Sequence, residues 1–238
     1  MAFDMNKYVF PLALGRAGTS KVTAFLGTGF FVKMNGVFLT AKHIFDFSPK
    51  ADLEFVASLK VGDGRMNFHH HKVSKIINHP SLDISICQIE GMTNNEYVRI
   101  SEDEPCMGTI VSSFGYGDTQ KENDFIQLHG RLFQGVVAAV RDNYEWRGIT
   151  TPSYELPFPI LNGASGSPIF GEGDPLTVIG LAYGNHKSKV YSEEEEEITE
   201  VIASGTKTIT KNIFNEFKTF GLAHKVQTIR ETIELFKE

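Results

Sequence analysis

Cysteine is scarce in this chain of 238 residues, which contains only Cys87 and Cys106. Two cysteines are too few for a disulfide framework, so a small secreted protein held together by disulfide bridges is excluded. No apolar stretch approaches the roughly 18 residues that a membrane-spanning helix needs. The N-terminal residues, where Asp4 and Pro11 interrupt a short apolar patch, also make a poor signal peptide. We therefore expect a soluble, cytoplasmic protein that has no membrane partner.

An excess of positive charge is absent as well. The 23 Lys and Arg residues are outnumbered by 29 Asp and Glu residues, which gives a formal net charge of −6. No Lys/Arg cluster offsets this balance, which argues against a nucleic-acid partner. Five of the acidic residues form the run Glu193–Glu197. Because like charges repel, we expect the stretch from about residue 187 to 197 to be a solvated insertion.

Metal-ligand spacing is missing too. The three histidines His69–His71 would point to opposite faces of a strand, so they cannot all bind one ion. The other candidates have no acidic or cysteine partner at ligand spacing, and they are His79, His129, His186 and His224. We expect each of these to be a structural or surface residue, and no metal site.

Short apolar runs are what the sequence has in quantity. From Phe30 to about Ala139 they include GFFV, VFLTA, DLEFVASL, KVSKII and DISICQI, separated by Gly, Pro, Asn and Asp. A second set includes GSPIF and LTVIGLAYG. Runs of this kind predict β-strands, and their regular spacing is typical of a barrel or a sandwich.

The C-terminal tail has a different period. Between Thr208 and Glu238 apolar residues recur at helical spacing. The positions are Ile209, Ile213, Phe214, Phe217, Val226, Ile229, Ile233 and Phe236. We therefore expect the chain to end in helical segments, with Gly221 between them.

The stretch LNGASGSPIF, residues 161–170, combines Ser165 and Ser167 with two glycines. Nucleophilic acyl transfer by a serine needs a hydroxyl, a base, and backbone N–H groups for the developing oxyanion. Gly163 lets the backbone turn so that two N–H groups can point at one spot, and Gly166 leaves room for a substrate. Taken alone, the stretch also fits a plain turn between strands. Ser165 is favoured over Ser167, which lies beyond the tight turn.

A histidine and an aspartate elsewhere decide between these interpretations. FLTAKHIF places His43 after an apolar strand, where a base is held rigidly yet can reach a cleft. HPSLDISICQI places Asp83 before a strand, where a carboxylate can be buried against the imidazole and fix its tautomer. The order His43, Asp83, Ser165 is that of the chymotrypsin-like double barrel. The rivals to Asp83 are Asp46, Asp52 and Asp63.

Together, GTGFFV, LTAKH, LDISICQI, NGASGSPIF and VIGLAYG resemble the chymotrypsin-like serine peptidases, and most of all their bacterial-type, trypsin-like branch. The resemblance implies an all-β fold with two six-stranded β-barrels, an active site in the cleft between them, and a C-terminal helix. We expect residues 1–238 to be a single peptidase domain. Its N-terminal barrel would span about 15–110, its C-terminal barrel 111–205, and its C-terminal helical segment 206–238.

The resemblance also assigns roles to residues of the site. The N–H groups of Gly163 and Ser165 would form the oxyanion hole. The strand that pairs with the substrate backbone would consist of Leu181, Ala182, Tyr183 and Gly184.

Departures from the family pattern narrow what we expect of the activation and of the substrate preference. Ala164 stands where vertebrate digestive members carry an Asp that pairs with a new N-terminus after zymogen cleavage, so that ion pair cannot form here. The protein is then active as made or is controlled by other means. Ala182 stands where glutamyl endopeptidases carry a His, so a preference for Glu is not supported. The stretch Pro159–Asn162 carries no charge, which indicates an apolar or small residue before the scissile bond.

The sequence thus predicts a serine endopeptidase that acts on protein or peptide substrates and needs no cofactor. His43 would act as general base and then general acid, Asp83 would orient it, and Ser165 would attack the scissile carbonyl. Two alternatives stay open. The chain could be a pseudo-protease or peptide-binding module, or a latent protease effector that a regulatory protein partner switches on in a stress or phage-defence system.

Overall fold

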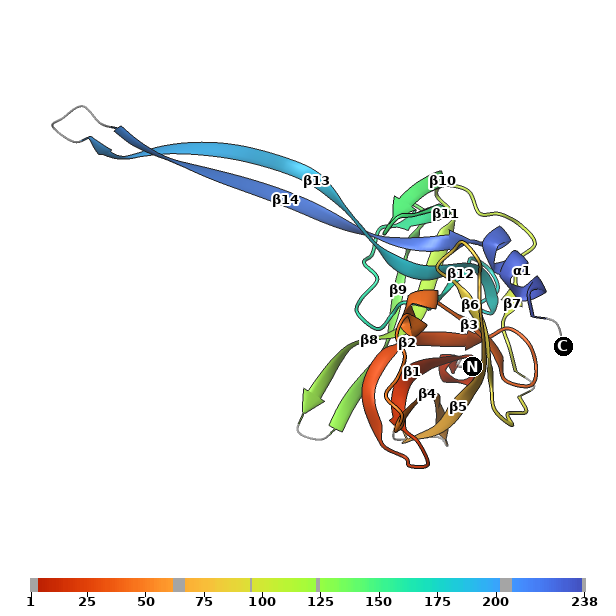
Figure 1. Cartoon of the computed structure of the whole chain (residues 1–238). Helices are drawn as coiled ribbons and strands as arrows, with labels where there is room; N and C mark the ends of the chain where they lie inside the picture. Colours follow the sequence, from red (N-terminus) through yellow and green to blue (C-terminus); the bar gives the residue numbers. More distant parts are fainter. Residues whose placement is uncertain (1–3, 62–66, 95, 123–124, 202–206, 237–238) are drawn as a thin grey trace.

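A computed structural model of the chain describes residues 4–61, 67–94, 96–122, 125–201 and 207–236. Figure 1 shows a compact body built of strands, from which one long two-stranded hairpin projects. The described part contains no helix that is long and apolar enough to cross a membrane. The strands of the body form two sheets.

The N-terminal strands close into a barrel in the order β1–β2–β3–β6–β5–β4. Their bounds are β1 (Val9–Arg16), β2 (Val22–Phe31), β3 (Val37–Thr40), β4 (Leu53–Val61), β5 (Asn67–Asn78) and β6 (Ser85–Ile89). Aromatic side chains fill the interior, since Phe10, Phe30 and Phe38 are all fully buried. The rings of Phe10 and Phe38 meet edge to face at 5.2 Å, a favourable arrangement. The predicted six-stranded barrel is confirmed, although it begins at Val9 and not near residue 15.

The C-terminal strands form an eight-stranded sheet in the order β10–β11–β14–β13–β12–β8–β9, with the short β7 parallel to β13. Their bounds are β7 (Arg99–Ile100), β8 (Ile110–Glu122), β9 (Phe125–Val136), β10 (Ala139–Trp146), β11 (Ile149–Leu156), β12 (Pro168–Gly171), β13 (Thr177–Val201) and β14 (Lys207–Lys225). Its core includes Tyr154, Leu156 and Ile169. The predicted all-β fold is confirmed, as one closed barrel and a second sheet larger than the six strands expected.

The strands β13 and β14 are 25 and 19 residues long and pair antiparallel as far as Val201 and Lys207. Their outer parts, residues 187–201 and 207–219, leave the body together (Figure 1), and we call them the ribbon. One prediction was wrong here, since the helix expected from residue 206 begins only at Val226. The stretch 187–197, expected to be a solvated insertion, is part of β13 and lies in this projecting hairpin.

Strand pairing explains why the tail is not helical over most of its length. The segment from Thr208 to Phe220 is rich in Thr, Ile and Phe, which favour strands. Along β14 the backbone finds partners on β13 that lie far away in the sequence. The periodicity of one segment does not reveal such a partner, so the apolar spacing alone pointed to a helix.

The chain ends in helix α1 (Val226–Glu234), whose buried face includes Val226 and Ile229. The carboxylate of Glu104 accepts the N–H of Gln227 at 3.1 Å and so caps the first turn from a distant loop. Arg230 donates from Nε to the carbonyl oxygen of Ser101 at 3.0 Å. These contacts fix the helix against the loop between β7 and β8.

Candidate active site

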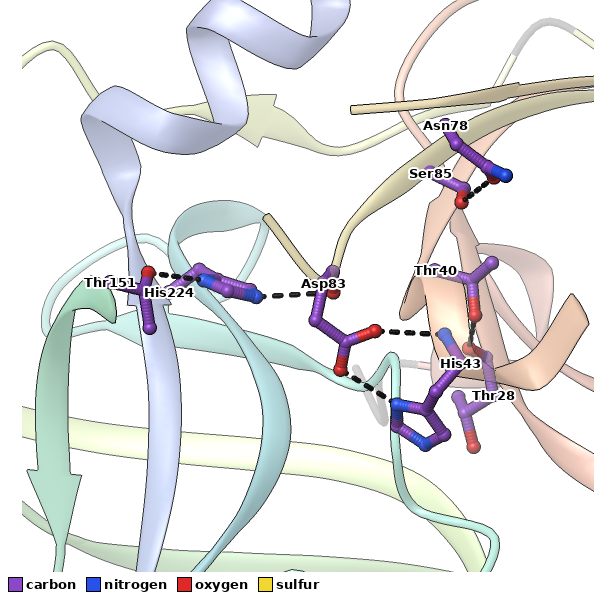
Figure 2. A network of polar contacts seen from close by, with 8 residues as sticks. All are labelled: Thr28, Thr40, His43, Asn78, Asp83, Ser85, Thr151 and His224. Atoms are coloured by element: carbon purple, nitrogen blue, oxygen red, sulfur yellow. Dashed lines mark hydrogen bonds and ion pairs between the residues drawn. The ribbon is translucent and has the colours of Figure 1, made fainter. Parts of the chain in front are cut away.

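His43 lies in the 3₁₀ turn η2 (Lys42–Phe45), directly after β3. Its backbone N–H donates to Oδ1 of Asp83 at 2.8 Å, and its ring Nδ1 lies 2.7 Å from Oδ2 of the same carboxylate (Figure 2). One carboxylate therefore holds both the main chain and the ring of His43. Because an ionised carboxylate only accepts hydrogen bonds, Nδ1 carries the ring proton and Nε2 keeps a free lone pair.

Asp83 is 3% exposed, and hydrogen bonds with two further histidines hold the loop that carries it. Its backbone carbonyl accepts a hydrogen bond from Nε2 of His224 at 3.1 Å, while Nδ1 of His224 lies 3.2 Å from the Thr151 hydroxyl (Figure 2). Burial lowers the pKa of His224 to about 4, so this ring is neutral near pH 7. Nδ1 of His79 accepts the N–H of Leu82 at 3.1 Å. The loop that carries Asp83 is thus held on two sides.

A tight turn shapes the backbone just before Ser165. The N–H of Ala164 donates to the carbonyl of Leu161 at 2.8 Å, and Gly163 has a φ of +89°, so the turn is of type II. A Cβ at Gly163 would lie 2.1 Å from the ring of Phe25. This position therefore requires glycine for both its conformation and its space.

The backbone amides of this loop differ in their partners. The N–H groups of Ala164, Gly166 and Ser167 donate to backbone carbonyls. Within the described part of the chain, the N–H groups of Gly163 and Ser165 have no acceptor. In a type I turn the peptide bond before Gly163 would be turned over and would present its carbonyl oxygen instead. The type II turn thus leaves two unpaired donors that can serve an oxyanion.

Thr28 of β2 anchors the same loop to the barrel. Its N–H donates to the carbonyl of Ser165 at 2.9 Å. Its hydroxyl donates to the carbonyl of Gly163 at 2.9 Å and accepts the N–H of Tyr116 at 3.1 Å. Thr28 is fully buried. Both carbonyls of the loop are therefore held on the side of the barrel.

Ser167, the other candidate nucleophile, is 1% exposed, and its hydroxyl has no hydrogen-bond partner among the described residues. A Cβ at Gly115 would lie 1.9 Å from this oxygen, so the hydroxyl faces the backbone of β8. Ala164 is also buried, in the apolar core of the second sheet. Of the two serines, Ser165 is the one that lines a cleft.

This cleft has a volume of about 460 Å³ and is lined by both His43 and Ser165. Its walls come from β2, the β10–β11 turn, the loop before Ser165, and β13. No hydrogen bond joins Ser165 Oγ to His43, both of which the structure describes. Such bonds are often long in substrate-free sites and tighten when substrate binds.

The rivals to Asp83 lie elsewhere. Asp46 is exposed after η2, Asp52 pairs with Arg16 at 3.6 Å, and Asp63 lies outside the described residues. The described residues also contain no group of three or more His, Cys, Asp or Glu that could hold a metal ion.

Of the four residues expected to pair with a substrate, Tyr183 and Gly184 line the cleft. Leu181 and Ala182 do not, because both are fully buried. Leu181 pairs with β12, and Ala182 is bonded through its N–H and its carbonyl to the loop after Ser165. The part of β13 that faces the cleft therefore begins at Tyr183, two residues later than expected.

Asn185 connects two walls of the cleft. Its Oδ1 accepts the N–H of Ile160 and its Nδ2 donates to the carbonyl of Ile160, both at 2.7 Å. Of the uncharged stretch expected to form the specificity pocket, Ile160, Leu161 and Asn162 line the cleft and Pro159 does not. One short side chain thus bridges these two walls of the cleft.

The turn between β10 and β11 contributes a wall that the sequence did not indicate. The ring of Trp146 lies 5.9 Å from the ring of His43 and 5.1 Å from that of Tyr183, centroid to centroid. Arg147, next in the chain, also lines the cleft. The sequence carries only a weak signal for them, an aromatic residue before an Arg-Gly turn, because their partners lie far away in the chain.

Comparisons with known proteins agree with this geometry. Residues 27–208 match the family of the trypsin-like peptidase domain. No curated protein matches the sequence. Among solved structures, the protease domain of MamO from Magnetospirillum magneticum is similar with a TM-score of 0.60 and 12% identity, over 98% of each chain.

Two further structures are similar. The HtrA-type protease AlgW, solved with a decapeptide, has a TM-score of 0.61 and 12% identity over 96% of this chain and 64% of that one. Deg5 has a TM-score of 0.58 and 16% identity over 95% and 87%. Likeness at these identities shows the fold, and the family match spans both sheets. The chain therefore belongs to the trypsin-like peptidase family.

Proposed function

We propose that this protein is a serine endopeptidase that cleaves protein or peptide substrates through an acyl-enzyme on Ser165. The observation that carries the proposal is the double contact by which Asp83 holds His43 in the cleft that Ser165 lines. The two unpaired amides of the loop support it. They lie in the backbone conformation that an oxyanion requires, although Ala164 excludes activation by an Asp at that position.

The residues perform the reaction in two halves. On substrate binding, Ser165 Oγ comes within reach of His43 Nε2, gives up its proton to that nitrogen, and attacks the scissile carbonyl carbon. The N–H groups of Gly163 and Ser165 bind the oxyanion. The tetrahedral intermediate then expels the amine, which takes the proton from Nε2. A water molecule next gives its proton to Nε2, attacks the acyl carbon, and releases the acid while Ser165 recovers its proton.

The contact between Asn185 and Ile160 sets an expectation for the substrate. A long side chain before the scissile bond would have to displace the two hydrogen bonds between these residues. Losing two half-buried hydrogen bonds costs about 1 kcal/mol each. We therefore propose a small apolar residue at this position, in line with the absence of charge in the loop at Ile160.

The proposal is tested by labelling with a fluorophosphonate and by casein hydrolysis. Ser165→Ala should lose the label, and its turnover should fall on the order of 10⁴-fold or more. Ser167→Ala is the matched control, and it should keep both. Because it removes a buried hydroxyl without a partner, it should also raise the free energy of unfolding by about 1 kcal/mol in urea titrations.

Other outcomes favour the alternatives. A folded protein that binds peptides, takes no label and hydrolyses nothing would be a peptide-binding module. A latent protease is favoured by one observation, the missing hydrogen bond between Ser165 and His43. Such a protease would label slowly alone and faster in the presence of a regulatory partner or an unfolded protein, whereas an enzyme active as made would label at one rate throughout.

A further inference from the structure

The β10–β11 turn that overhangs the cleft has an unusual residue in it. Arg147 and Gly148 form the two-residue loop between Trp146 and Ile149, with φ of +50° and +77°. Positive φ at both positions is the signature of a type I′ turn, where Asn, Asp or Gly is preferred. The other non-glycine residue with positive φ in the described part is an asparagine, Asn35. Arginine in this conformation costs roughly 1 kcal/mol, so the backbone of the turn does not explain its presence.

Trp146 fixes the position of this turn over the site. A Cβ at Gly184 would lie 2.6 to 2.7 Å from three atoms of the indole, so the ring fills the space that a side chain there would occupy. The same ring packs edge-on against Tyr183 and lies beside His43. The turn is therefore held against the strand that faces the cleft.

The charge of Arg147 has no partner in the described structure. Its guanidinium lies 4.6 Å from the centre of the Trp146 ring, and no described carboxylate forms an ion pair with it. Nearby cations differ, because Arg141 pairs with Glu155 and Lys225 pairs with Asp142, both at 2.8 Å. A guanidinium stacked on an aromatic face keeps its N–H edge free for a planar carboxylate.

Arg147 is also the one Lys, Arg, Asp or Glu among the described residues that line the cleft. The rest of the lining is uncharged or aromatic, apart from His43. Arg147 is exposed, so its charge lies at the rim of the cleft. In a protein with a net charge of −6, acidic substrates are repelled overall, and a local cation at this rim would favour their binding. A carboxylate at this point would gain charge-assisted hydrogen bonds.

From these observations we propose that Arg147 forms a carboxylate-binding subsite, which selects substrates with an acidic side chain on the acyl side of the scissile bond. The proposal rests on the proposed peptidase function. The acyl side is assigned because the turn packs against Gly184. The next residue, Asn185, bonds Ile160, in the stretch expected to hold the residue before the scissile bond. A free C-terminal carboxylate has the same chemistry, and the test separates the two sources.

The test uses peptides with a small residue before the scissile bond and either Glu or Gln at each of the three preceding positions. At one of these positions, kcat/KM of the full chain should be about tenfold higher for Glu than for Gln. In Arg147→Gln this ratio should fall to about 1, because the Glu peptide loses its charge-assisted hydrogen bonds. Arg147→Glu should instead prefer a Lys peptide.

A matched control separates the site from the overall charge. Arg16→Glu makes the same charge change as Arg147→Glu, but at an exposed position on the barrel. It should keep the preference for a Glu peptide over a Gln peptide. Peptides with a free or an amidated C-terminus should give the same ratio, because a dependence on that end would assign the subsite to a terminal carboxylate and overturn the proposal. A Glu/Gln ratio near 1 at every position in the unchanged chain would overturn it too.

Binding to Ser165→Ala keeps the test independent of turnover. Measured by fluorescence anisotropy, fluorescein-labelled Glu peptide should bind about tenfold tighter than Gln peptide, and the added change Arg147→Gln should remove the difference. If the full chain neither labels nor cleaves but this difference is found, the proposed function fails and the subsite stands. Equal binding of the two peptides, or no binding of either, would refute the subsite.

Discussion

At the scale of single residues, His224 shows how a buried side chain outside the cleft fixes residues of the site. It stacks on Tyr183 with ring centroids 4.2 Å apart and holds the backbone of Asp83. Its burial in an apolar environment disfavours the charged ring, and this lowers its pKa. A residue that the sequence suggested was structural or surface thus touches both the strand that faces the cleft and the backbone of Asp83, whose carboxylate holds His43.

The lowered pKa of His224 predicts how the free energy of unfolding depends on pH. The unfolded chain binds a proton at this ring below pH 6.5, whereas the folded chain does so only below about pH 4. The stabilisation is complete above pH 6.5 and is lost as the pH falls through this window, because the unfolded state then binds more protons. The expected loss is about 3 kcal/mol.

Urea titrations at several pH values measure this loss. In His224→Gln, which keeps a donor for the Asp83 carbonyl, the difference in unfolding free energy between pH 7 and pH 4 should be smaller by that amount. The half-buried His70 and His79 have lowered pKa values as well, so the comparison is made between the two proteins. Identical pH profiles would show that His224 is protonated in the folded state.

At the scale of elements, the ribbon is separate from the barrel and the site. Its strands pair with each other from Lys187 and Thr219 outward, and Figure 1 shows it projecting beyond the body. Its root is held to the turn over the cleft, since the hydroxyl of Tyr144 lies 2.5 Å from Nδ1 of His186. The body should therefore fold without the outer ribbon, provided that His186 is kept.

Shortening the ribbon tests this independence. Lys187 and Thr219 are register partners, so an Asn-Gly turn can join them in place of residues 188–218. The unfolding free energy of the body should change by less than about 1 kcal/mol, because the ribbon projects beyond the body (Figure 1). Hydrolysis of short peptides should persist. A much larger loss in thermal or urea unfolding would show that the ribbon packs on the body.

At the scale of the whole molecule, the two sheets meet at the site through Thr28. This one residue of the barrel bonds the loop of Ser165 at two carbonyls and the backbone of Tyr116 in β8. The proposed oxyanion donors lie in the loop before β12 of the second sheet, while His43 lies in the turn after β3 of the barrel. Their relative position therefore depends on contacts between the sheets, of which Thr28 makes three.

We expect Thr28→Val to lose both stability and activity. The variant keeps the shape of the side chain but removes the hydroxyl, which leaves the Tyr116 N–H and the Gly163 carbonyl unpaired in a buried place. The free energy of unfolding should fall by about 2 to 3 kcal/mol. kcat should fall more than KM rises, because the oxyanion donor at Gly163 loses its anchor.

Thr23→Val is the control for this change. It removes one hydroxyl that donates to Leu14 at 3.2 Å, on the same strand but away from the cleft. It should leave kcat unchanged and cost less than about 1 kcal/mol. If Thr28→Val were equally mild, the loop of Ser165 would be held by other contacts.

Much of the fold and the centre of the site could be predicted from sequence, because short segments carry them. The strands of the barrel follow from local apolar runs, and His43, Asp83 and Ser165 each stand in a recognisable local pattern. Thr28, His224 and Trp146 could not be found in this way. Their roles arise from contacts with residues far away in the chain, as does the strand β14, which has a helical spacing but a distant partner.

Trp146 is the single tryptophan of the chain, and it lies in the cleft beside His43. The tryptophan fluorescence of the protein therefore originates in one indole at the proposed site of peptide binding. Its emission wavelength reports how much water reaches the cleft, and its intensity responds to protonation of the neighbouring imidazole, since imidazolium quenches indole. The protein carries its own optical probe of occupancy, which needs no chromogenic substrate and no label.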